Sequence, residues 1–203
     1  MAFGFLALGD SYTIGEGVAP GERWPAQLTA RLRGEGIDIA DPQIVAKTGW
    51  TTDELAAAME GSAFAPPYEL VALLVGVNNQ YRGRPLDEYR VQFRALLQRA
   101  VALAGGNAAH AIVVSIPDWG VTPFAAREGR DGAKVAREID AFNQAASSET
   151  DRTGAHWVDV TTISRLPGSS GELVDDGLHP SGAQYARWID AMLPAVRAVL
   201  REA

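Results

Sequence analysis

The 203-residue chain contains no cysteine. This absence excludes a disulfide framework, a thiolate nucleophile and every cysteine-ligated metal site. Long apolar runs are missing as well, because no stretch approaches the roughly 18 residues that a membrane-spanning helix needs. We therefore expect no membrane span.

Positive charge is scarce. Lys and Arg number 18 against 25 Asp and Glu, which gives a formal net charge of -7. Nucleic acids and anionic membrane surfaces favour a basic patch, so we expect neither as a partner. The first ten residues have no basic segment and reach an acidic residue too early for a secretory signal. These features together predict a soluble, cytoplasmic protein.

Five short apolar runs, partly β-branched, predict strands, and helical patterns alternate with them. Such alternation indicates a parallel sheet with helices on both faces. No repeat or long linker divides the chain, so we predict a single α/β domain over residues 1–203. The predicted strands are 3–8, 43–46, 70–75, 110–116 and 156–160, and the predicted helices are 22–33, 51–60, 86–104, 130–150 and one after Pro180 with a kink at Pro194.

Residues with useful chemistry follow four of the predicted strands. Ser11 follows the first strand, Gly49 the second, Asn78 the third and Trp119 the fourth. Because parallel strands end at the same edge of a sheet, and ligands of such sheets bind there, these residues are expected to share one cleft.

A serine needs a neighbouring base to become a nucleophile, and a third group usually orients that base. Ser11 has a candidate base in His179 and a candidate orienting group in Asp176, three residues before it. In a tight turn this carboxylate can reach Nδ1 and leave Nε2 to accept a proton. The other two histidines open predicted strands at the opposite edge of the sheet and are predicted to be structural: His110 and His156.

Acyl transfer also requires hydrogen-bond donors for the developing oxyanion. The backbone amide of Gly49 and the side-chain amide of Asn78 are candidates. Each residue alone also fits a plainer role, since glycine is common in turns, and asparagine and serine commonly cap turns and helices.

Four segments, taken in order, resemble the conserved blocks of the SGNH (GDSL-type) hydrolases: Gly9-Asp10-Ser11, Gly49, Gly76-Val77-Asn78-Asn79 and Asp176-Gly177-Leu178-His179-Pro180. The resemblance spans nearly the whole chain. It implies that Ser11 is the nucleophile and an oxyanion donor, that Gly49 and Asn78 complete the oxyanion hole, and that Asp176 and His179 complete the triad. It also implies a three-layer α/β/α sandwich with a five-stranded parallel sheet of flavodoxin-like order, and hydrolysis of esters or thioesters without a metal or other cofactor.

Two positions depart from the family pattern. Tyr12 stands where many members carry leucine, and we expect it to change the packing beside the nucleophile. Asn79 stands where the third block usually has aspartate, so a hydrogen bond or charge that supports the Asn78 loop is expected to differ.

Loop residues at the functional edge are candidates for the substrate pocket, since such pockets are mostly aromatic and apolar with few polar groups. Packing of the core or of a lid is the alternative for each of them. We expect a small-molecule ester as the substrate, while the sequence leaves its acyl and alcohol parts, and the oligomeric state, open. The candidates are Tyr12, Trp50, Gln80, Tyr81, Trp119 and Phe124.

A flavodoxin-like electron carrier that binds a flavin is the alternative function. Residues 11–16 faintly resemble the phosphate-binding loop of flavodoxins, although Ile14 interrupts the expected spacing of hydroxyl and glycine. This alternative gives no role to Asn78 or to the pair Asp176 and His179, and the hydrolase is therefore the preferred hypothesis.

Overall fold

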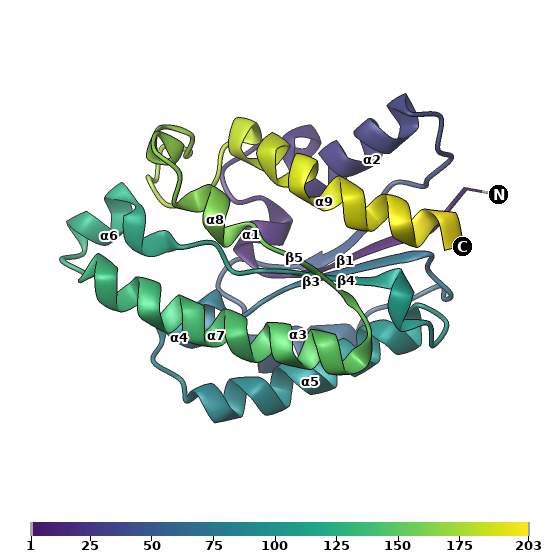
Figure 1. Ribbon diagram of the computed structural model, residues 1–203, viewed down its shortest axis with the longest axis horizontal. Helices are drawn as coiled ribbons and strands as arrows, with labels where there is room; N and C mark the ends of the chain where they lie inside the picture. Colours follow the sequence, from purple (N-terminus) through teal and green to yellow (C-terminus); the bar gives the residue numbers. More distant parts are fainter. Residues whose placement is uncertain (1, 203) are drawn as a thin grey trace.

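A computed structural model describes residues 2–202 and contains a five-stranded sheet with every strand parallel to its neighbours (Figure 1). The strand order is β2-β1-β3-β4-β5, which confirms the predicted flavodoxin-like order. The strands are β1 (Phe5–Gly9), β2 (Gln43–Ala46), β3 (Leu70–Leu74), β4 (Ala111–Val114) and β5 (His156–Val158).

Helices cover both faces of the sheet and complete the predicted three-layer sandwich (Figure 1). One layer holds α2 (Trp24–Gly34) and α9 (Gly182–Glu202), and the other holds α3 (Thr52–Glu60), α5 (Leu86–Leu103) and α7 (Gly132–Thr153). Short helices lie beyond the carboxyl ends of the strands, on the left of Figure 1: α1 (Ser11–Ile14), α4 (Val77–Tyr81), α6 (Pro123–Arg127) and α8 (Thr161–Ser164). Single 3₁₀ turns cover Pro20–Glu22, Ala108–His110, Trp119–Val121 and Ser169–Gly171.

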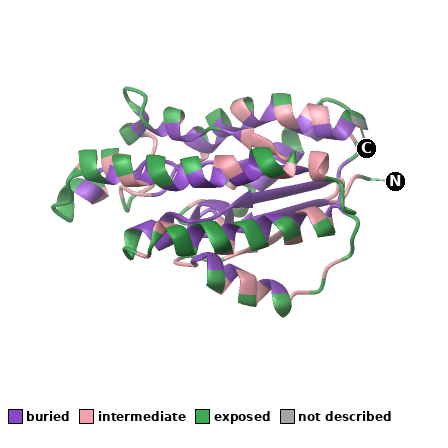
Figure 2. Cartoon of the chain, turned by 60° about the horizontal axis from the view of Figure 1, so that its bottom comes forward, coloured by how far each residue is buried: buried purple, intermediate pink, exposed green. Residues whose placement is uncertain are grey.

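The core lies between the sheet and the two helical layers. All five residues of β1 and all five of β3 are buried, as expected for central strands with helices on both faces. Figure 2 shows the same separation along the helices, whose inner sides are buried and whose outer sides are exposed. The apolar stripe of α9 is buried against this core at Trp188, Met192 and Val196. None of the helices within residues 2–202 has the length and apolar character needed to cross a membrane.

Several predicted boundaries were wrong. The fourth and fifth strands end before the predicted residues 116 and 160, because side chains take over the backbone hydrogen bonds there. The N–H of Ile116 donates to Asn143 Oδ1 at 2.8 Å, and that of Val160 donates to Ser115 Oγ at 2.8 Å. Helix α9 extends through Pro194, with buried side chains on both sides of the proline, and the kink at Pro194 stays a prediction.

Candidate active site

A cavity of about 200 Å³ lies at the carboxyl edge of the sheet. Ser11, Gly49, Asn78 and His179 all line it, although they come from four separate segments of the chain. The structure thus brings together four of the residues that the sequence pattern selected. Among residues 2–202, no three His, Asp or Glu side chains lie close enough together to hold a metal ion.

Ser11 is the first residue of α1 and follows β1 after a single intervening residue, Asp10. Gly9 makes this sharp turn possible, because a Cβ there would lie 2.3 Å from Thr13 Oγ1 and 2.5 Å from the Leu74 carbonyl. Only 5% of Ser11 is exposed, and the residue lines the cavity.

Asp10 is fully buried and caps α1 by accepting the N–H of Tyr12 at 3.1 Å. Burial raises its pKa to about 7, although the backbone amides of Tyr12 and Gly76 act to lower it. Within the described part of the chain, Asp10 Oδ2 has no hydrogen-bond partner. A buried acid at this position is therefore neutral over much of the acidic range.

Tyr12 packs beside the catalytic candidates, as the sequence suggested. Its ring centroid lies 5.7 Å from that of His179 and 6.2 Å from that of Trp188. The Tyr12 carbonyl accepts the hydroxyl of Tyr185 at 3.0 Å, which anchors α1 to α9. Tyrosine at this position, where many family members carry leucine, thus places an aromatic ring against the His179 imidazole.

His179 and Asp176 meet in one tight turn. His179 Nδ1 lies 2.6 Å from Asp176 Oδ2, while Asp176 Oδ1 accepts the backbone N–H groups of Leu178 at 2.7 Å and His179 at 3.0 Å. Partial burial raises the pKa of Asp176, but the hydrogen bonds from the His179 ring and these amides outweigh it and leave the pKa below its usual value. The carboxylate is therefore ionised at neutral pH and fixes Nδ1 as a donor.

Helix α6 holds this turn from outside. The Gly177 carbonyl accepts the N–H of Phe124 at 3.0 Å, and the guanidinium of Arg127 donates to the Asp176 carbonyl. On the other side of the turn, His179 O accepts the N–H of Val174 at 2.9 Å. The position of the His179 ring is thus set by contacts on both sides of its turn.

Three N–H donors belong to residues that line the cavity. The backbone N–H groups of Ser11 and Gly49 have no acceptor among residues 2–202, and Gly49 adopts a φ of 87° that favours glycine. Asn78 Nδ2 donates one hydrogen to the Trp50 carbonyl at 2.9 Å, which orients the amide and leaves its second hydrogen for another acceptor. Arg82 Nη2 donates to the Gly49 carbonyl at 2.6 Å and restrains that loop.

Asn79 supports this wall from behind. It is fully buried, its Oδ1 accepts the N–H of Thr52 at 3.1 Å and its Nδ2 donates to Thr52 Oγ1 at 2.7 Å. An amide makes both bonds without placing a charge in the interior, whereas a carboxylate has no donor for the second bond. The asparagine thus joins the Asn78 loop to the first turn of α3 by neutral hydrogen bonds.

Aromatic rings form the opposite wall. Trp119 lies between Tyr81 and Phe124, with centroid distances of 5.4 Å and 6.2 Å and both pairs edge-on. All three residues, and Tyr12, line the cavity as predicted candidates. Trp50 and Gln80 do not line it.

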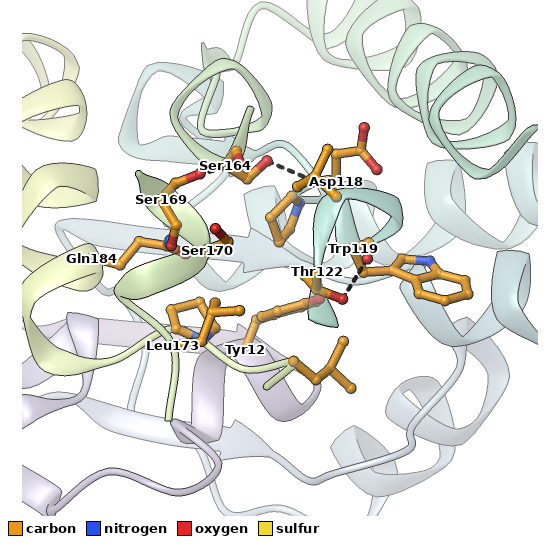
Figure 3. Close-up of a pocket in the computed structure, with 13 residues that line it drawn as sticks. Tyr12, Asp118, Trp119, Thr122, Ser164, Ser169, Ser170, Leu173 and Gln184 are labelled. Carbon is orange, nitrogen blue, oxygen red and sulfur yellow. Dashed lines mark hydrogen bonds between the residues drawn. The ribbon is translucent and has the colours of Figure 1, made fainter. Parts of the chain in front are cut away.

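A second cavity of about 10 Å³ lies behind Tyr12 and Trp119 (Figure 3). This volume suits about one water molecule, so the cavity is too small for a substrate group. Its polar wall fixes the loop that carries Trp119. Thr122 Oγ1 donates to the Trp119 carbonyl at 2.6 Å, and Ser164 Oγ accepts the N–H of Asp118 at 2.8 Å (Figure 3).

The remaining histidines lie away from the cavity. His110 precedes β4 and His156 is the first residue of β5, so both lie at the amino ends of strands. Sequence reasoning missed the contacts of Arg127 with the Asp176 carbonyl and of Gln80 with Trp119, because each joins residues that lie far apart in the sequence.

Solved structures of known proteins share the fold of this chain. The structure of TesA matches with a TM-score of 0.75 and 21% identity over 96% of this chain and 98% of that chain. The psychrotrophic esterase EstA from Pseudoalteromonas sp. gives 0.71 and 20% over 97% and 98%, and the acetylxylan esterase Axe2 from Geobacillus stearothermophilus gives 0.69 and 21% over 97% and 96%. At these identities the likeness shows a shared fold. The comparison with curated proteins gave no match.

The sequence itself identifies the family. Residues 7–187 match the GDSL-like lipase/acylhydrolase family, a span that includes Ser11, Gly49, Asn78, Asp176 and His179. This match confirms the resemblance seen in the four sequence blocks and favours a hydrolase over a flavin-binding electron carrier. The chain belongs to the GDSL-like lipase/acylhydrolase family and is a carboxylic ester hydrolase.

Proposed function

We propose that the protein cleaves carboxylic esters through an acyl-enzyme on Ser11, with His179 as general base and Asp176 as the group that orients it. The observation that carries this proposal is the 2.6 Å contact between His179 Nδ1 and Asp176 Oδ2, in a turn whose histidine shares one cavity with Ser11. A base held in this tautomer presents Nε2 as an acceptor for the serine proton.

In the first half-reaction, Ser11 Oγ attacks the ester carbonyl carbon while its proton passes to His179 Nε2. The bond from this carbon to the alcohol oxygen then breaks, and the imidazolium gives its proton to the leaving alcohol. In the second half-reaction a water molecule attacks the acyl group, again with His179 as base, and Ser11 is regenerated. Ser11 Oγ and His179 Nε2 form no hydrogen bond within residues 2–202, but such catalytic contacts commonly tighten when substrate binds.

Negative charge develops on the carbonyl oxygen during both attacks. We propose that the N–H groups of Ser11 and Gly49 and the second hydrogen of Asn78 Nδ2 receive it. Each of these donors is held in place before the reaction, two by backbone geometry and one by the Trp50 carbonyl. Preorganised donors of this kind lower the barrier because they need no rearrangement as charge develops.

An active-site probe tests the nucleophile directly. Treatment with a fluorophosphonate should label Ser11 alone, as mapped by mass spectrometry of peptides. Ser11→Ala should remove both labelling and hydrolysis of p-nitrophenyl butanoate, whereas Ser148→Ala, at a half-buried position of α7 outside the cavity lining, should keep both. Labelling at another serine, or full activity in Ser11→Ala, would overturn the assignment. EDTA should leave the rate unchanged.

A further inference from the structure

The side chain of Gln80 bridges the aromatic wall and α7. Its Oε1 accepts the indole N–H of Trp119 at 2.8 Å, and its Nε2 donates to Glu138 Oε2 at 2.7 Å. Gln80 is 6% exposed and Trp119 is 2% exposed, so solvent hardly competes for the first of these bonds. The glutamine thus connects α4, the loop after β4 and α7 through one amide.

The bond from Gln80 determines how the indole of Trp119 lies. A buried N–H without a partner is costly, so the ring is held in the orientation that keeps this bond. Its polar edge then faces Gln80, while the ring meets Tyr81 and Phe124 edge-on. If Gln80 Oε1 were removed, the indole N–H could form a hydrogen bond only with another acceptor, and the Trp119 ring would have to rotate to reach it.

A cation fixes the same wall from its outer side. The guanidinium carbon of Arg130 lies 5.0 Å from the Tyr81 ring centroid and 5.7 Å from that of Trp119. A cation is attracted to the face of an aromatic ring, so these contacts help to hold both rings in place. Trp119 is therefore held by a hydrogen bond at its polar edge, two rings and one cation, and any shift of it changes the shape of the cavity.

We propose that Gln80 is a positioning residue that sets the acyl preference of this hydrolase by fixing Trp119. This inference rests on the proposed function of the Ser11 site. Gln80 does not line the cavity, so it acts on the substrate only through the indole.

The substrate class follows from the wall and from the volume that it encloses. The apolar and aromatic side chains that line the cavity together with Ser11 and His179 belong to Tyr12, Val77, Tyr81, Trp119, Phe124 and Leu178. An apolar cavity of about 150 Å³ holds a benzene ring. The cavity of about 200 Å³ also has to hold the ester group itself. We therefore assign it esters whose acyl part is apolar, either aryl or aliphatic with up to about six carbon atoms.

The experiment compares Gln80→Met with Gln43→Met across p-nitrophenyl acetate, butanoate, hexanoate and decanoate. Gln43, at the amino end of β2, is a matched control because its amide also makes two hydrogen bonds. Its Oε1 accepts the hydroxyl of an aromatic residue, Tyr68, at 2.5 Å, and its Nε2 donates to the Ala63 carbonyl at 2.9 Å. Methionine keeps the length of each side chain and removes its hydrogen bonds.

The wild type should favour butanoate and hexanoate over decanoate. Gln80→Met should change the ratio of kcat/KM for hexanoate to kcat/KM for acetate by about tenfold, mainly through a change in KM. This is the lower end of the discrimination that one methylene group produces in an apolar pocket. Gln43→Met should leave the ratio unchanged even where its melting temperature falls. Glu138→Gln, which retains an acceptor for Gln80 Nε2, should also keep the wild-type ratio.

A double-mutant cycle isolates the route through the indole. Trp119→Phe removes the N–H, so adding Gln80→Met to it should change the ratio little further. An unchanged ratio in Gln80→Met, or additive effects in the cycle, would overturn the role of Gln80. Should Gln80→Met fail to fold, Glu138→Leu provides the second test, because it removes the anchor of the same amide and should shift the ratio. A wild type that cleaves none of the four esters would instead refute the proposed function.

Discussion

The carboxylate of Asp176 contacts His179 at two points, the ring Nδ1 at 2.6 Å and the backbone N–H at 3.0 Å. The two contacts use different oxygens, because Oδ2 faces the ring and Oδ1 accepts the backbone amide. One side chain therefore both closes the turn and selects the tautomer of the His179 imidazole. Asp175, the preceding acid, is also exposed, but its carboxylate has no hydrogen bond or ion pair within residues 2–202.

Replacement of Asp176 by asparagine should reverse this tautomer. The two backbone N–H groups at Oδ1 will hold the amide oxygen of an asparagine there, which turns its NH₂ toward His179 Nδ1. The ring must then accept at Nδ1 and carry its proton on Nε2, where it cannot take a proton from Ser11. We expect kcat to fall by about 10²–10⁴, the upper value being that of a protease triad. Steady-state kinetics with p-nitrophenyl butanoate measures it.

Asp175→Asn is the matched control. It changes the same charge one residue earlier and should stay within about tenfold of the wild-type rate, since an exposed carboxylate alters only the local field. Circular dichroism should show native spectra for both variants. A larger loss of kcat in Asp175→Asn than in Asp176→Asn would mean that Asp175, and not Asp176, orients His179.

The sequence was sufficient for the sheet and for much of the site because both depend on local patterns. Apolar runs and their order predicted all five strands, and the residues after each strand share an edge in any parallel sheet. Ser11, Gly49 and Asn78 therefore follow from the position of each strand end. His179 and Asp176 are three residues apart, and a short turn alone brings them together.

Other features depend on contacts between distant segments and leave no local pattern. Gln80 and Glu138 are 58 residues apart, and Arg127 reaches a carbonyl 49 residues away. The short helices α1 and α4 have too few residues to show a period, so the sequence indicated only loops there. The full burial of Asp10 also depends on the packing around it, since an aspartate after a strand usually faces solvent.

Alanine at Asn78 should mainly lower kcat, whereas alanine at Asn79 should mainly lower stability. Asn78→Ala removes a proposed oxyanion donor, so kcat should fall by about 10²–10³ while stability changes little. Asn79→Ala removes both bonds to Thr52 inside the protein, so the free energy of unfolding should fall by about 1–3 kcal/mol with a smaller loss of kcat. Urea unfolding and kinetics on both variants measure the two effects. Equal losses of kcat would contradict the assignment of Asn78.

Arg127 should affect the rate through the turn that it holds. Its guanidinium donates to the Asp176 carbonyl from a side chain outside the cavity lining. Arg127→Ala should lower kcat by about two- to tenfold, the equivalent of one hydrogen bond of about 0.5–1.5 kcal/mol. Arg31→Ala, which changes another exposed arginine, on α2, should leave kcat unchanged. The same small loss in both variants would indicate a general effect of charge.

Asp10 should make the stability of the protein fall as pH rises from about 4 to about 7. Burial raises the pKa of Asp10 in the native state to about 7, whereas the pKa of an aspartate in an unfolded chain is about 3.9. Between these values the native state binds more protons than the unfolded state, so a rise in pH favours unfolding by up to about 1.4 kcal/mol per unit. The stabilising contribution of the neutral acid is thus complete below about pH 4 and lost above about pH 7.

Asp10→Asn keeps the cap of α1 and cannot ionise, so it should escape this loss. Carboxyl groups with lowered pKa values, such as Asp176 and Glu149, stabilise the native state less as the pH falls into the acidic range. The wild type and Asp10→Asn both contain these groups, so their effects cancel in the difference between the two free energies of unfolding. The free energy of unfolding of Asp10→Asn minus that of the wild type should therefore rise between pH 4.5 and 7.5, by on the order of a few kcal/mol. Urea unfolding at four pH values measures this difference. Parallel stability curves for the two proteins would show that the Asp10 carboxyl is already ionised in the native state at pH 4.5, despite its burial.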